Sequence, residues 1–206
     1  MKKSFFIIAA GLFSSVSIAQ NVSVGFKTGL NLSSISYNDG GEKDNSSFRP
    51  ALHAGIVLDL SLSENLSLQP NLLLSGRGGI FKDDDVKTFC TFNSIEIPIN
   101  IIYKTVGNEK GRFFFGGGPN VGINISGKFY KSDDPNNIDD YEFGTKDEEV
   151  RRLDFGLNFL AGYELKSGIF VSTNYNIGLS NWVNLNDLTW KNNILAFSVG
   201  YFLKRR

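Results

Sequence analysis

Few residues in this 206-residue chain belong to the types that carry out nucleophilic, acid–base or metal chemistry. There is one histidine, His53, and one cysteine, Cys90. One cysteine cannot close an intrachain disulfide or build a multi-cysteine zinc site, and one imidazole excludes every motif that needs two. His53 could act as a general base, but the sequence shows no evident serine and acid partner for it. We therefore assign no catalytic, cofactor-binding or metal-ligating residue, and we expect a non-enzymatic protein.

Cys90 and an acidic segment are the other candidates for chemistry. Cys90 could be a reactive thiol or form an intermolecular bridge, although a packed, reduced cysteine is the default interpretation. Segment 128–151 contains eight acidic residues and four basic ones, without the fixed ligand spacing of an EF-hand loop. We favour a solvated loop over a cation site, and we interpret 37–47 and 81–88 in the same way. The acidic residues are Asp133, Asp134, Asp139, Asp140, Glu142, Asp147, Glu148 and Glu149.

The elements that must position these residues follow a period of two. Apolar and polar residues alternate in eight runs, whereas the i, i+3, i+4 spacing of an amphipathic helix is missing over any useful length. The sequence therefore predicts eight β-strands. They lie at about 22–32, 48–62, 66–80, 89–103, 112–126, 153–165, 169–179 and 195–203.

The connections between these runs alternate in length. Long connections are predicted at 37–47, 128–151 and 182–192, medium ones at 81–88 and 104–111, and tight turns at 63–65 and 167–168. Long and short loops thus sort to opposite ends, as in an up-and-down meander with an even number of strands. Both termini are then expected at the end with the short turns.

The amino terminus has the features of a secretory signal. Lys2 and Lys3 precede the apolar run Phe5–Phe13, and Ser17-Ile18-Ala19 offers small residues for cleavage. A membrane-spanning helix would need ~20 apolar residues, and serines interrupt this segment too early. We predict a cleaved signal peptide at 1–19 and a single domain at 20–206.

Composition narrows the class of protein. Lys and Arg together number 21, as do Asp and Glu, so the formal net charge is +0. A nucleic-acid partner is not expected, because the basic surplus that neutralises phosphates is missing. An exported chain without a later apolar helix is either a soluble barrel or a barrel that enters a membrane as strands.

The polar face of the strands separates these two classes. It is rich in Gly, Asn and Ser, which suit a crowded interior, whereas a water-facing surface usually carries more Lys, Glu and Thr. The charges on this face number four of each sign, so they can pair inside a narrow barrel. They are Lys27, Arg49, Arg77 and Arg152, and Asp59, Glu96, Asp154 and Glu164. We therefore predict that the apolar face looks outward to lipid.

Aromatic residues fit the same interpretation. Belts of tyrosine mark the membrane interfaces of β-barrels, and tryptophans often anchor there. The candidates are Tyr103, Tyr163, Tyr175 and Tyr201, together with Trp182 and Trp190 beside the last long loop.

Five short motifs carry a family resemblance. They are IEIP at 95–98, GGGP at 116–119, DFGL at 154–157, GYEL at 162–165 and YNIGLSN at 175–181. In this order they resemble the PorT-like outer-membrane β-barrel family, found mainly in Bacteroidetes. The resemblance implies an eight-stranded outer-membrane barrel and, for the founding branch, a part in type IX secretion and gliding. One departure is the carboxyl end, where Lys204-Arg205-Arg206 follows Phe202-Leu203 instead of the terminal aromatic residue of many such barrels.

The motifs themselves are structural. Pro98 cannot donate a ladder hydrogen bond, so we expect it at a bulge or near a rim. Gly116, Gly117 and Gly118 would allow strong curvature or close approach of the backbone.

The sequence thus predicts an eight-stranded antiparallel transmembrane β-barrel in the outer membrane, surrounded by lipid and monomeric. We expect a scaffold or interaction protein that displays its long loops outside the cell and contacts an envelope protein through 37–47 and 128–151. Two alternatives stay open. One is a soluble lipocalin-like carrier of an apolar ligand, and the other is a lipid-modifying barrel enzyme around His53.

Overall fold

A computed structural model describes residues 22–144, 149–185 and 188–203. The predicted signal peptide at 1–19 and the basic tail Lys204-Arg205-Arg206 lie outside the described residues. Within them, no helix is long and apolar enough to cross a membrane.

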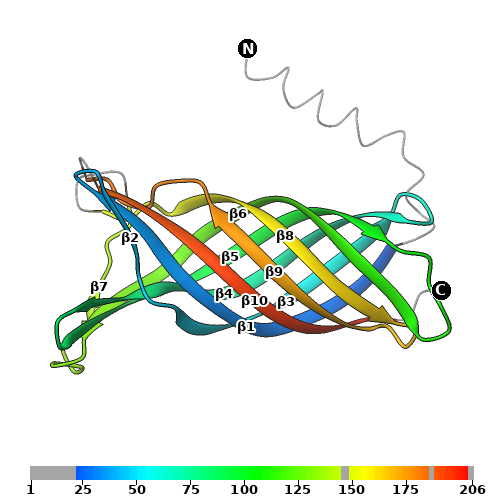
Figure 1. Cartoon of the computed structure of the whole chain (residues 1–206), viewed down its shortest axis with the longest axis horizontal. Coiled ribbons are helices and arrows are strands. Elements are labelled where there is room, and N and C mark those ends of the chain that lie inside the picture. Colours follow the sequence, from blue (N-terminus) through cyan, green and yellow to red (C-terminus); the bar gives the residue numbers. More distant parts are fainter. Residues whose placement is uncertain (1–21, 145–148, 186–187, 204–206) are drawn as a thin grey trace, which may run out of the picture.

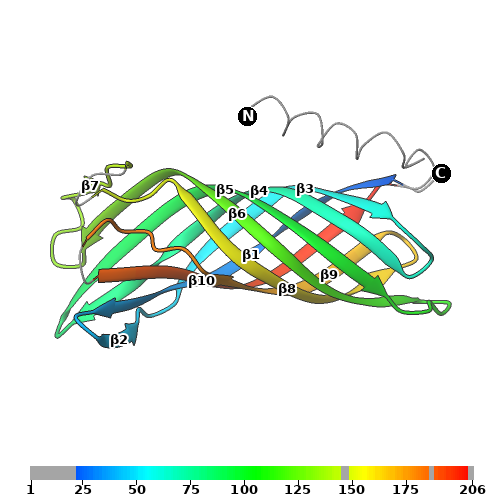
Figure 2. The ribbon, with the colours of Figure 1, turned by 90° about the horizontal axis from the view of Figure 1, so that it is seen from above.

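Eight long strands form one closed antiparallel sheet. The strands are β1 (Val22–Asp39), β3 (Arg49–Ser61), β4 (Leu66–Asp83), β5 (Val86–Lys104), β6 (Gly111–Lys131), β8 (Leu153–Leu165), β9 (Ile169–Gly178) and β10 (Leu188–Phe202). Each pairs with its neighbour along the chain, and β10 pairs with β1 to close the ring (Figures 1 and 2). Two short strands, β2 (Glu42–Asn45) and β7 (Asp139–Asp140), pair antiparallel with the end of β1 and with β6 near its end. The predicted barrel and its up-and-down order are confirmed.

The turns sort to two ends as the loop lengths predict. The short turns lie at one end together with the start of β1 and the end of β10, and the β1–β2 and β4–β5 hairpins lie at the other (Figure 1). We call these the short-turn end and the outer end.

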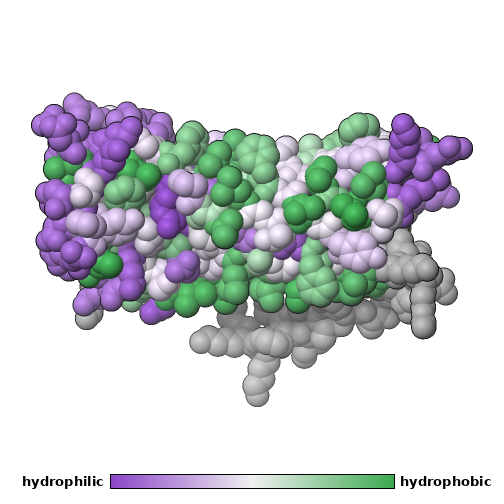
Figure 3. All heavy atoms as spheres, turned by 90° about the horizontal axis from the view of Figure 1, so that it is seen from below, coloured by the Kyte–Doolittle hydropathy of each residue, from purple (hydrophilic) through white to green (hydrophobic). Residues whose placement is uncertain are grey.

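Alternation places the apolar face outside, as predicted. Along β4, Leu72 and Leu74 are 53% and 63% exposed, whereas Leu73 between them and Asn71 and Ser75 on either side are buried. Figure 3 shows apolar side chains over the middle of the barrel and hydrophilic side chains at both ends. Such a band is what a hydrocarbon layer requires of a β-barrel.

Several strands extend further at the outer end than the sequence indicates. The predicted loop 81–88 is wrong, because β4 and β5 continue to a turn of Asp84 and Asp85, with Asp84 in the left-handed region (φ 46°). The predicted loops 37–47 and 128–151 likewise contain β2 and β7, and β10 begins at Leu188 inside the predicted loop 182–192. Above the membrane both faces of a strand can be polar, so apolar alternation no longer marks its extent.

The expected position of Pro98, at a bulge or near a rim, is also wrong. Pro98 lies in the middle of β5 opposite Asn120, and the register shift falls at Asn93/Ser94. Near Pro98 the β4–β5 ladder is interrupted between the Leu73–Glu96 and Pro70–Ile99 pairs, since a proline has no N–H to donate.

Gly116 and Gly118 meet the expectation of close approach. Both positions face the barrel interior, where a Cβ atom would collide with the carbonyl oxygens of Ile101 and Ile99. These glycines therefore let β6 lie close against β5.

Leu72 lies near the middle of the apolar band, so Leu72→Arg tests which face is outside. The substitution should cost ~2–4 kcal/mol of folding free energy, because a charged side chain near the bilayer midplane is poorly solvated. Leu62→Arg, in the turn between β3 and β4, should cost ~0–1 kcal/mol. Urea unfolding in lipid vesicles, followed by the gel shift between folded and heated barrel, measures both. Equal costs would contradict the assignment of the outward face.

Candidate functional site

At the short-turn end, the interior holds four ionised side chains from four strands. Lys104 on β5 pairs with Asp59 on β3, and its Nζ lies 3.9 Å from Glu164 Oε2 on β8. Arg112 on β6 binds the same carboxylate, with its Nε and Nη2 3.1 and 3.0 Å from Oε2. Two cations and two anions thus neutralise one another where water is largely excluded.

Lys104 and Arg112 are interior charged residues that the sequence analysis missed. The signal was present, because Lys104 continues the inward positions of Glu96 and Asn100, and Arg112 continues those of Gly116 and Asn120. Lys104 is the last residue of β5 and Arg112 the second residue of β6, at the very ends of the predicted runs of apolar alternation. An apolar layer of Val57, Ile102, Phe114, Leu160, Phe170 and Phe202 also fills the barrel interior.

Nearer the outer end, Arg77 is the centre of a second group. Its guanidinium is fully buried, pairs with Asp154, and places Nε 3.1 Å from Glu96 Oε1. The Trp182 ring lies 4.8 Å from the guanidinium carbon, in cation–π contact. Arg77 therefore joins β4 to β5, β8 and the last loop across the interior.

Two cations predicted for the interior lie elsewhere. Arg152 is exposed and stacks over Phe143 at 5.1 Å, and Arg49 is half-buried and donates to the Arg77 carbonyl oxygen at 3.2 Å. Arg152 precedes β8, where the alternation of the strand does not yet apply. The predicted balance of four charges of each sign nevertheless holds, because Lys104 and Arg112 take the places of Arg49 and Arg152.

Between the two ionic groups, His53 is part of a hydrogen-bonded chain. Its Nε2 lies 3.0 Å from Ser198 Oγ and its Nδ1 lies 2.7 Å from Asn31 Oδ1. Asn31 Nδ2 donates to Ser75 Oγ and to the Gly76 carbonyl oxygen, which turns Asn31 Oδ1 toward the imidazole. Nδ1 is therefore the donor to Asn31, and Nε2 accepts from Ser198.

This order of serine, histidine and amide is also the order of a nucleophile, a base and its orienting group. The sequence analysis missed Ser198 and Asn31 because they lie far from His53 in the chain. However, the cavity beside His53 measures about 30 Å³ and is lined by Lys27, Glu96 and several asparagines. A cavity of this size has room for about one water molecule and none for an ester substrate. The hydrogen bonds therefore support an interior histidine with a structural role.

The filled interior of the barrel also overturns the lipocalin-like alternative. A carrier of an apolar ligand needs an apolar cavity inside the barrel, and here the middle of the interior is filled by polar side chains. The buried asparagines among them are Asn31, Asn71, Asn100, Asn120, Asn124, Asn158, Asn174, Asn176 and Asn192.

An apolar plug closes the outer mouth of the barrel. It consists of the buried residues Ile35, Cys90, Phe92, Val150 and Trp182, with Phe81, Phe129, Tyr141, Phe143 and Trp190 packed against them. Segments before β8 and before β10 supply Val150 and Trp182, so loop residues fold into the mouth. The prediction that Trp182 anchors the membrane interface is wrong, because it is fully buried. Trp190 is half-buried and stacks on Phe81 at 5.2 Å.

Cys90 is an internal part of this plug. It is 2% exposed, and the Tyr141 hydroxyl lies 3.0 Å from its sulfur. Burial raises the pKa of Tyr141, so this hydroxyl stays protonated and donates the hydrogen bond. The default interpretation of Cys90 as a packed, free thiol is confirmed.

The predicted tyrosines do face outward. Tyr103, Tyr175 and Tyr201 are each between 43% and 46% exposed, and Tyr163 is half-buried against Phe113. Tyr103, Tyr163 and Tyr201 lie close to the ends of β5, β8 and β10 and form a belt at the short-turn end. Tyr175 lies in the middle of β9, away from this belt.

The acidic segment 128–151 gathers no metal-ligand cluster among its described residues, which exclude 145–148. Lys128 Nζ lies 3.9 Å from Asp140 Oδ1, and both side chains are exposed.

A closed antiparallel ring with an apolar exterior and a filled, charge-balanced interior defines an outer-membrane β-barrel. Residues 18–184 match the outer membrane protein beta-barrel domain family, and the chain belongs to this family. No curated protein matches the sequence. This match identifies the broader outer-membrane β-barrel family and does not identify the PorT-like family.

Solved structures of two outer-surface proteins are among those similar to this chain. Ail, the attachment invasion locus protein of Yersinia pestis, is 12% identical with a TM-score of 0.47, and the match covers 89% of this chain and 100% of Ail. Neisserial surface protein A is 12% identical with a TM-score of 0.45, and the match covers 85% of this chain and 96% of that protein.

Removing the central cation should destabilise the barrel strongly. Arg77→Met leaves Asp154 and Glu96 buried without their counter-charge, which costs ~3–5 kcal/mol for a buried ion pair. Adding Glu96→Gln and Asp154→Asn should restore more than half of the loss, because the uncompensated charges are then gone. The same urea unfolding measures both variants. A triple variant no more stable than Arg77→Met would contradict the electrostatic explanation.

Ser198→Ala tests the structural role of His53. The loss of the hydroxyl leaves His53 Nε2 without its donor inside the barrel and should cost ~1–3 kcal/mol. Ser172→Ala, which removes only a 3.3 Å contact to Asn174, is the matched control and should cost less. We expect a fluorophosphonate probe to leave the wild-type protein unlabelled, and covalent labelling at Ser198 would contradict this interpretation.

Proposed function

We propose that this barrel is a non-enzymatic interaction or scaffold protein that works through its outer end. The observation that supports this proposal is the filled interior. Two ionic groups, the His53 chain and the apolar plug occupy successive levels of the barrel. An eight-stranded barrel is just wide enough for side chains to fill, so a diffusion route for solutes is disfavoured. Contacts with other molecules are then made on outside surfaces.

The outer end offers a polar surface for such contacts. The β1–β2 hairpin, the β4–β5 hairpin and the β6–β7 segment extend beyond the apolar band there (Figures 1 and 3). A groove of about 510 Å³ lies among β1, β2 and β10 and falls largely within the predicted contact region 37–47. Its lining includes Tyr37, Asn38, Lys43, Asp44 and Lys191, an aromatic ring among charged and amide groups. This mixture suits a polar segment of an envelope protein.

In-cell photo-crosslinking tests this proposal. A photoreactive residue at Asn45 or Asp134, at the outer end, should yield a discrete protein adduct, whereas one at Glu109 in a short turn should not. Lys43→Glu with Lys191→Glu should abolish the adduct at Asn45, because two charges of the groove are reversed. Lys87→Glu, on another outer hairpin, is the control. Adducts formed only from Glu109 would overturn the proposal.

The finer hypothesis is a role in type IX secretion, which is supported by the sequence resemblance to the PorT-like family alone. Deleting the gene and measuring secreted proteins in the medium tests it. A strain that secretes normally would reject this role while leaving an interaction function intact.

A further inference from the structure

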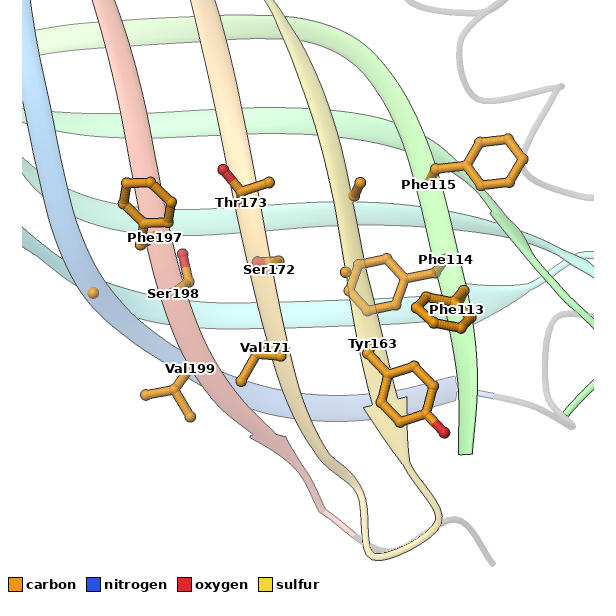
Figure 4. Close-up of a pocket in the computed structure, with 13 residues that line it drawn as sticks. Phe113, Phe114, Phe115, Tyr163, Val171, Ser172, Thr173, Phe197, Ser198 and Val199 are labelled. Carbon is orange, nitrogen blue, oxygen red and sulfur yellow. The ribbon is translucent and has the colours of Figure 1, made fainter. Parts of the chain in front are cut away.

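Two apolar grooves lie side by side on the outside of the barrel, toward the short-turn end. Both are shallow and open. The first, of about 800 Å³, crosses β6, β8, β9 and β10 and reaches Gly29 on β1, and the second, of about 550 Å³, crosses β1, β3 and β10 and reaches Ile169 on β9. Val199 on β10 lines both grooves and forms the ridge between them. In Figure 4, Phe113 and Tyr163 stand on one side of the first groove and Phe197 and Val199 on the other.

The grooves arise because small residues are set among large ones. Ala161 and Thr173 point outward between Phe113, Phe115 and Phe197, so the wall is lower there. In the second groove, Ala54 lies among the side chains of Phe26, Ile56 and Tyr201. Large side chains cover most of the remaining apolar band, including Leu72 and Leu74 on β4.

Both grooves reach the rim at the short-turn end. Phe113 and Tyr163 are each two residues from the end of their strands, and Ile169 is the first residue of β9. The Tyr163 hydroxyl points toward the turns (Figure 4). A chain lying in either groove would therefore leave the apolar band at the level of these turns.

The β5–β6 and β8–β9 turns, which lie below the first groove and next to Ile169 of the second, carry positive charge. Lys166 N donates to the Lys110 carbonyl oxygen at 3.2 Å, which holds the two turns together, and both side chains are exposed. Glu109 lies in the same turn, so this rim has a net charge of +1 from Lys110, Lys166 and Glu109. Glu164 above it does not add a free negative charge, because Arg112 binds its carboxylate.

We infer that this wall of the barrel binds one diacyl phospholipid of the inner leaflet. The two grooves hold its two acyl chains on either side of Val199, and the phosphate lies at Lys110 and Lys166. The short turns of outer-membrane barrels face the periplasm, so this rim meets the leaflet that contains phospholipid. A ligand with two apolar chains joined at one anionic end matches two apolar grooves that end at one basic rim.

Native mass spectrometry of the barrel in mild detergent, titrated with phosphatidylglycerol, tests the inference. We expect the wild type to retain one phospholipid at low lipid concentration. Ala161→Phe with Thr173→Phe should remove this adduct by filling the first groove, whereas Leu72→Phe, outside both grooves, should keep it. The heat-dependent gel shift confirms that each variant is folded.

The basic rim is tested separately with Lys110→Gln and Lys166→Gln. Each should weaken phosphatidylglycerol binding about fivefold. Binding of a diacylglycerol with the same chains, which has no phosphate, should not change. An undiminished adduct in the filled-groove variant, or a mass of two barrels in place of the lipid adduct, would overturn the inference. None of these outcomes depends on whether the outer end binds a protein.

Discussion

The constraint that shapes this protein is that backbone N–H and C=O groups in hydrocarbon must be paired within the protein. A sheet satisfies this only when its edges meet, and here β10 pairs with β1 over 15 residue pairs from Gly25–Phe202 to Asp39–Leu188. Closure in turn forces every second side chain into a narrow interior. The outward residues must then be apolar. The inward residues must fill the space and pair one another's charges and hydrogen-bonding groups.

The interior meets these demands in levels. Ion pairs lie at both ends of the polar region, where Lys104 and Arg77 each contact carboxylates from other strands. Between them, amides, hydroxyls and His53 form hydrogen bonds, and apolar side chains close the outer mouth. A buried charge is costly unless it is paired, so each cation fixes the strands that supply its partners. The interior therefore holds the barrel in shape and leaves surface contacts to its outside.

The two ends of the outer surface differ in what they offer. The outer end carries hairpins with charged and amide side chains, above the apolar band. The short-turn end carries grooves lined by aromatic and small residues, bordered by Lys110 and Lys166. The first surface suits a polar protein segment and the second suits a lipid, because each is matched to the solvent that surrounds it.

The sequence by itself determined the eight strands, their outward face and the balance of interior charge, because a period of two assigns each side chain to one side of a sheet. It did not determine which charges enter the barrel. Lys104 and Arg112 lie inside and Arg152 outside, because alternation assigns a side only within a strand and does not show where each strand begins or ends. Nor could it place Trp182 in the outer mouth or bring Ser198 and Asn31 to His53. Those contacts join residues far apart in the chain, and only closure of the ring sets their height and their partners across the interior.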